Sequence, residues 1–315
     1  MKLRDYIFAK DCKFNIQDIE IPDMNNEEKN IMKTFVDITT YIQEIEQLFR
    51  IFRINLKLIL NFYRLGNDDK ISKNYDFDLE DTDEYIINSL VINYISSAKT
   101  LKESIENFMK KFVGENNEIN IKYNNECLKK LYDNVFSYRL LLRLRDFSQH
   151  GHLIVSEVFE DKYCFDIEQI LSTPHFNINK KLKLEMESIR RDIYDKYGDH
   201  PRIAFTLSIV EFNYCIIKTY NEFFYTVEEV LKQYIQSMKK IIKDRPDICY
   251  KSNNVLNGFI FFENDDGILH CFNPNGDSLK MFYEMKAKAA FILKEEEKEL
   301  ELLKKSFSSN WISLN

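Results

Sequence analysis

The scarcity of glycine and proline limits what this chain can fold into. Its 315 residues include 7 glycines and 5 prolines, which is about 4% of the chain against about 12% in an average protein. β-Sandwiches, propellers and repeated βαβ units need many turns, and turns depend heavily on these two residues. We therefore expect long helices. Because the chain also has 25 phenylalanines and 18 tyrosines, we expect a bulky aromatic core.

The remaining composition is that of a globular chain, with 44% apolar and 30% charged residues. The net charge of −7 excludes a protein that coats nucleic acid through bulk charge, so an anionic substrate has to meet a local basic site. The six cysteines include no C-x-x-C pair, which favours a reducing compartment over a disulfide framework. No apolar leader or membrane-length apolar run is present, and we expect a cytoplasmic protein with no membrane contact.

Apolar residues recur at helical spacing along most of the sequence. This pattern predicts helices over 26–65, 83–113, 121–150, 179–197, 201–243 and 278–306. Two stretches rich in β-branched and aromatic residues predict small β-hairpins, one near 152–165 and one over 255–272. We expect an N-terminal arm over 1–25, a helical bundle with an inserted hairpin over 26–250, and a C-terminal hairpin plus charged helix over 251–315.

Several common catalytic motifs are absent. The sequence has no glycine-rich phosphate loop, no G-x-S-x-G nucleophile turn and no H-E-x-x-H zinc motif. His150, His152 and Cys164 lie near one another in sequence, but their spacing matches no recognised metal site. We therefore expect neither a metal nor another cofactor.

The end of the predicted helix 121–150 carries the most informative residues, in the sequence LLLRLRDFSQHGHLIV. His150 is suited to proton transfer because histidine titrates near neutral pH. Arg145 offers a fork of N–H donors to the non-bridging oxygens of a phosphodiester. Together they can cleave RNA without a metal. On a regular helix the two side chains point about 140° apart, so the helix has to end at His150 or a second copy of the chain has to complete the cleft.

A structural role is the alternative for each of these residues. Arg145 can pair with an acidic neighbour, and His150 can interact with the negative end of the helix. His152 can support His150 or simply begin a strand. A basic patch that includes Lys239, Lys240 and Lys243 can contact an RNA backbone or be a solvated helix end. With Arg143 and His152, these lysines are the candidate RNA-binding residues.

The stretch Leu144–Val155, in which Arg145 and polar Asp146 are followed by an aromatic residue, a spacer and His150, resembles the HEPN family of RNases (higher eukaryotes and prokaryotes nucleotide-binding). That family often has Asn where this chain has Asp146. The resemblance implies a HEPN-like helical bundle and a metal-independent endoribonuclease that leaves 2′,3′-cyclic phosphate ends. It also implies a homodimer with a composite cleft, acting as a toxin or antiphage effector with an antitoxin or defence-system partner. The resemblance implies that Arg145 binds the scissile phosphate and that His150 is the acid or base. It also implies that Asp146 orients either Arg145 or His150.

A rival hypothesis assigns no catalysis to the chain. Long charged helices and the acidic balance are also typical of a helical protein-interaction module or a regulatory subunit of a defence system. In that case Arg145 and His150 have no common cleft, and the chain cleaves no RNA.

Overall fold

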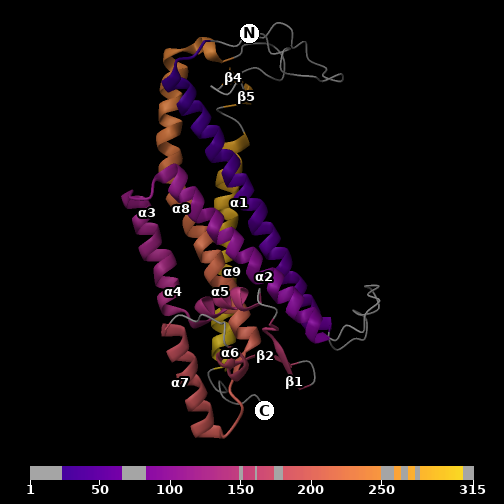
Figure 1. The fold of residues 1–315 in the computed structure, drawn as a ribbon. Helices are drawn as coiled ribbons and strands as arrows, with labels where there is room; N and C mark the ends of the chain where they lie inside the picture. The colour runs from indigo at the N-terminus through magenta and orange to yellow at the C-terminus, as the bar shows by residue number, and fades with distance from the viewer. Residues whose placement is uncertain are drawn as a thin grey trace. The chain divides into compact units, whose positions relative to one another are not determined.

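A computed structural model of the chain is predominantly helical, and its named strands form two small antiparallel sheets (Figure 1). The expected mainly α-helical fold class with small hairpins is therefore confirmed. None of the helices in the part of the chain that the structure describes is both long and apolar enough to cross a membrane. The described residues are 23–65, 83–148, 152–159, 162–173, 180–249, 259–263, 269–273 and 277–307.

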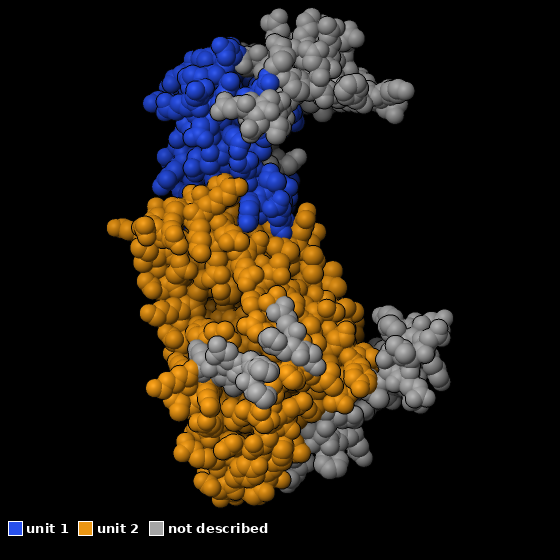
Figure 2. All heavy atoms as spheres, viewed as in Figure 1, with its two compact units in different colours: residues 1–44, 224–288 blue, residues 45–223, 289–315 orange. Residues whose placement is uncertain are grey.

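The chain divides into two compact units, each assembled from segments that are distant in sequence (Figure 2). Unit 1 is made of residues within 1–44 and 224–288, and unit 2 of residues within 45–223 and 289–315. Three long helices contribute residues to both units: α1 (Asn26–Leu65), α8 (Phe205–Asp244) and α9 (Asp277–Phe307). α1 and α9 match the helices predicted over 26–65 and 278–306.

Aromatic side chains build much of the core of unit 2. The helical spacing of apolar residues on α1 buries Phe49 and Phe52 on one side of that helix. Phe49 stacks on Tyr220 of α8 with ring centroids 3.9 Å apart, and Phe52 stacks on Tyr94 of α2 (Asp83–Phe108) at 5.0 Å. Aromatic pairs of this kind contribute about 1 kcal/mol beyond the area they bury. These contacts therefore fix which faces of the helices meet.

The prediction of one continuous helix over 121–150 is wrong, because the chain leaves helical geometry at Val135. Its φ of −113° and ψ of 110° are those of an extended residue. The guanidinium of buried Arg139 donates to the carbonyl of Tyr132 at this break and pairs with Glu185, so side-chain contacts stabilise the interruption. The segment consists of α3 (Glu118–Tyr123), the π-helical η4 (Asn124–Lys129), α4 (Lys130–Asn134) and α5 (Phe136–Ser148).

A π-helical turn also ends the helix predicted over 83–113. η3 (Met109–Val113) follows α2 directly, and the amide of Gly114 donates to the carbonyl of Met109 at 3.0 Å. Gly114 has a φ of 101°, a conformation that favours glycine. The predicted end of this helix at residue 113 is confirmed.

The hairpin predicted near 152–165 is confirmed and belongs to a larger sheet. β1 (Ser156–Phe159) pairs antiparallel with β2 (Lys162–Asp166), and β3 (Arg202–Ala204) pairs with the other edge of β2. The predicted start of a helix at Pro201 is therefore wrong, because α8 begins only at Phe205. The carbonyl of Pro201 accepts from the amide of Ile167 at 3.2 Å, which extends the sheet pairing and holds this stretch in an extended conformation.

Two helices connect β2 to β3. The short α6 (Ile167–Ser172) is capped by Asp166, whose carboxylate accepts from the amide of Gln169 at 3.1 Å. α7 (Lys180–Tyr197) matches the helix predicted over 179–197. It ends before Gly198, which has a φ of 63°.

Unit 1 combines the start of α1 with the second half of α8, the first part of α9 and a hairpin. β4 (Ile260–Glu263) and β5 (Leu269–Phe272) pair antiparallel, as predicted for 255–272, and their turn lies outside the described residues. Phe35 of α1 packs on Phe272 of the hairpin with ring centroids 5.9 Å apart. The hairpin therefore covers part of α1.

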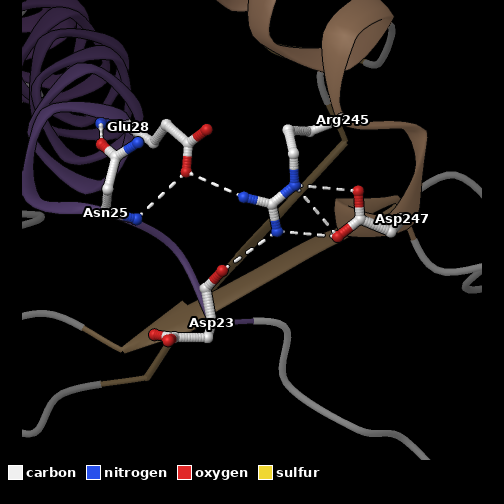
Figure 3. A network of polar contacts seen from close by, with 5 residues as sticks. All are labelled: Asp23, Asn25, Glu28, Arg245 and Asp247. Carbon is white, nitrogen blue, oxygen red and sulfur yellow. Dashed lines mark hydrogen bonds and ion pairs between the residues drawn. The ribbon is translucent and has the colours of Figure 1, made fainter.

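A polar network holds the start of α1 to the end of α8 (Figure 3). Asn25 and Glu28 form a reciprocal cap, in which each side chain accepts from the backbone amide of the other residue. Arg245 donates from Nη1 to Glu28 at 3.3 Å, and from Nη2 to the carbonyl of Asp23 at 3.0 Å and to Asp247 at 2.7 Å. Arg245 follows Lys243 of the predicted basic patch by two positions, and its guanidinium is engaged in this network.

Candidate functional site

The candidate residues Arg143, Arg145 and Asp146 occupy the exposed side of α5 in unit 2. Their helical neighbours Leu144 and Phe147 are completely or almost completely buried. Because α5 anchors these apolar side chains in the core, it turns the intervening polar side chains toward solvent. Arg145 keeps 29% of its side chain exposed and Asp146 keeps 40%. The side chain of Arg145 is therefore partly accessible from solvent, although its Nε is buried.

A second helix supplies another cation to this place. Nζ of Lys99 on α2 donates to Oδ1 of Asp146 at 2.9 Å. Nη1 of Arg145 lies 3.5 Å from the same oxygen, and Nη1 of Arg143 lies 3.8 Å from the other carboxylate oxygen. Lys99, Arg143, Arg145 and Asp146 are called the basic cluster below. It holds three cations against one carboxylate.

The electrostatics of the basic cluster favour negative charge. Partial burial alone would raise the pKa of the Asp146 carboxyl, but hydrogen bonds and charge from Lys99 and Arg145 outweigh it and lower this pKa below its ordinary value. Among these four residues, three positive charges face one ionised carboxylate. Such a place attracts a phosphate or another carboxylate.

The chain that follows α5 is fixed by Asn88, a buried residue of α2. Its Oδ1 accepts from the amides of Ile154 and Val155 at 2.7 and 2.9 Å, and its Nδ2 donates to the carbonyls of Val155 and Glu84 at 2.7 and 2.8 Å. This amide therefore positions the residues that lead from the end of α5 to β1.

Of the two histidines at the end of α5, only His152 lies in the described part of the chain. Its ring packs on Phe147 with centroids 4.8 Å apart. His150 lies outside the described residues, so the expected convergence of His150 and Arg145 stays a prediction. Asp146 pairs with Arg145 and Arg143. This contact agrees with the alternative in which Arg145 has a structural role and pairs with an acidic neighbour.

The other candidate RNA-binding residues lie on a different element. Lys239, Lys240 and Lys243 are exposed near the end of α8 and belong to unit 1, whereas the basic cluster belongs to unit 2. Their role in RNA binding stays a prediction.

The remaining described histidines have structural partners. His200 pairs with Asp166 at 2.8 Å, and the ring of His270 stacks on Phe262 at 5.0 Å. Among the residues that the structure describes, no three metal-ligating side chains come together.

Sequence reasoning missed Lys99. The one available signal is that Lys99 is the first charged residue after the uncharged run 85–98. An uncharged run of this length favours burial of one face of the helix, so a cation that directly follows the run has to meet a carboxylate or solvent. The sequence does not show that the carboxylate is Asp146, because 47 positions separate the two residues.

The chain matches no known family model, no curated protein and no solved structure.

Proposed function

We propose that the protein is a metal-independent endoribonuclease of HEPN type, with its active site at the end of α5. The observation that carries this proposal is the partly exposed side chain of Arg145 within the basic cluster. A merely structural arginine needs one carboxylate partner, whereas this place gathers three cations on two helices around a single carboxylate. These cations suit the negatively charged phosphodiester of an RNA backbone.

In the proposed reaction, the ribose 2′-oxygen attacks the adjacent phosphorus while the bond to the 5′-oxygen breaks. His150 takes the proton from the 2′-hydroxyl or gives one to the leaving 5′-oxygen. Arg145 stabilises the charge that builds up on the non-bridging oxygens. The products are a 2′,3′-cyclic phosphate and a free 5′-hydroxyl. In this proposal, a homodimer forms the complete cleft, and the protein acts in the cytoplasm as a toxin or antiphage effector.

An RNA cleavage assay with EDTA present tests this proposal. The parent chain is expected to cleave single-stranded RNA and leave cyclic phosphate ends. His150→Ala and Arg145→Met are each expected to lose at least about 100-fold in rate. His200→Ala is the matched control, since His200 already has a carboxylate partner in Asp166, and it should cleave like the parent. Equal cleavage by the parent and His150→Ala would contradict the proposal.

One observation favours the rival function, a non-catalytic protein-interaction module. Ile51, Ile54 and Leu58 form an apolar stripe on α1, with 50%, 55% and 39% of their surface exposed. If the chain is such a module, replacing all three by glutamine should abolish binding of a partner protein, and neither the parent nor the variant should cleave RNA. A chain that never cleaves RNA but loses its partner through these substitutions is the interaction module.

A further inference from the structure

The basic cluster contains an internal anion at the place where a phosphate would bind. Lys99 and Arg145 approach the same oxygen of Asp146, at 2.9 and 3.5 Å, and Arg143 approaches the other at 3.8 Å. A carboxylate presents two oxygens that share one negative charge. The two non-bridging oxygens of a phosphodiester share one negative charge in the same way, so the donors that face Asp146 suit a phosphodiester as well.

We propose that Lys99 is a further phosphate-binding residue of this site, and that Asp146 is an internal competitor that an RNA phosphate displaces from Lys99 and Arg145. This inference rests on the proposed function, because it takes single-stranded RNA as the ligand. Lys99 then contributes a cation from α2 beside the arginines of α5.

The exposure of Asp146 makes the exchange physically reasonable. With 40% of its side chain exposed, the carboxylate can rotate into water, where its charge is well solvated. Lys99 and Arg145 are less exposed, at 24% and 29%. Lys99 and Arg145 therefore have less freedom to turn into water than the carboxylate that they face.

A neighbouring ion pair on α2 provides the comparison. Lys102 donates to Glu106 at 2.7 Å, and its side chain is 21% exposed. Lys102 thus matches Lys99 in helix, burial and type of partner. It differs in that this pair holds one cation and one carboxylate, with no excess positive charge.

Binding of a fluorescent 2′-O-methyl oligoribonucleotide, measured by anisotropy over a series of salt concentrations, tests the inference. The probe lacks the 2′-hydroxyl nucleophile, so binding is measured without cleavage. Asp146→Asn is expected to bind about fivefold tighter than the parent, and Lys99→Met about fivefold more weakly. Lys99→Met should also lower the slope of log affinity against log salt by about 0.7, the value for one phosphate contact on a single strand. Lys102→Met should change neither quantity.

The double variant Lys99→Met/Asp146→Asn tests the coupling between the two residues. If Asp146 competes partly through Lys99, the asparagine substitution gains less affinity in the Lys99→Met background than in the parent. Helical circular dichroism verifies that each variant is folded. Unchanged or weaker binding by Asp146→Asn, or equal binding by Lys99→Met and Lys102→Met, overturns the inference.

The cleavage assay separates this inference from the proposed function. One outcome is that the chain cleaves RNA through His150 although Asp146→Asn does not bind the oligoribonucleotide more tightly than the parent, or Lys99→Met does not bind it more weakly. In that case the inference alone is wrong. If the binding order holds and no RNA is cleaved, the ribonuclease proposal alone is wrong.

Discussion

Lys99 and Asp146 form an ion pair of 2.9 Å between two helices, although 47 positions separate them in the chain. The pair ties the middle of α2 to the last turn of α5, directly beside Arg145. The same contact therefore contributes both to the packing of these two helices and to the charge of the candidate site.

The ion pair makes stability depend on pH in a defined direction. The pKa of Asp146 is lower in the folded chain than its ordinary value, so ionised Asp146 stabilises the fold above about pH 4, and this contribution is lost as the pH falls through the lowered folded pKa. The parent should therefore lose stability relative to Asp146→Asn as the pH falls from about 6 to about 3. Because Asp146 is partly exposed, the difference should stay below about 1 kcal/mol. Urea unfolding of both chains across this range measures it, and a difference independent of pH would contradict the assignment.

Asn88→Ala should destabilise unit 2 strongly. The substitution removes a buried amide that bonds Ile154, Val155 and Glu84, and it leaves their backbone groups without these partners. We expect a loss of about 3 kcal/mol in the free energy of unfolding, measured by chemical denaturation. Asn134→Ala is the control, because the exposed amide of Asn134 donates to the carbonyl of Lys130 in its own helix, and its effect should stay below about 0.5 kcal/mol. Equal effects of the two substitutions would show that the Asn88 bonds are not formed.

The pair between Arg139 and Glu185 should show the cost of leaving a buried charge alone. Arg139 is 2% exposed, and Glu185 on α7 accepts from its Nε at 3.1 Å. Glu185→Gln keeps the size of the side chain but removes the counter-charge, and it should cost about 2 kcal/mol of stability. On the same helix, Glu187 lies 4.0 Å from Lys183 in an exposed pair, so Glu187→Gln should cost less than about 0.5 kcal/mol. Thermal unfolding compares the two variants, and a tolerant Glu185→Gln would mean that Arg139 is solvated.

The long elements could be predicted because their signals are local. Apolar residues at helical spacing and a nearby glycine are enough to place α1, α7 and the end of the helix at Gly114. The break at Val135 could not be predicted in this way. It depends on Arg139 reaching back to the carbonyl of Tyr132 and across to Glu185, and no residue at the break itself opposes a helix.

The same distinction applies to the site. Arg143, Arg145 and Asp146 are close in sequence, so one helix end contains all three. Lys99 belongs to the cluster only through the packing of α2 against α5. β3 was missed for a similar reason. Proline ahead of an apolar helical pattern is typical of a helix start, and only the presence of β2 alongside makes residues 202–204 a strand.

The π-helical η4 gives this part of the chain unusual tolerance for the loss of one residue. A π turn bonds each amide to the carbonyl five positions back instead of four, so it accommodates one extra residue in a wider turn. Deleting one residue from Asn124–Lys129 would let this stretch return to ordinary helical bonding while α4 keeps nearly the same orientation, and buried Leu131 would still face the interior. The same deletion within a regular α-helix would rotate every following side chain by about 100°. The loss of a residue is therefore accepted at η4 and not in the regular helices beside it.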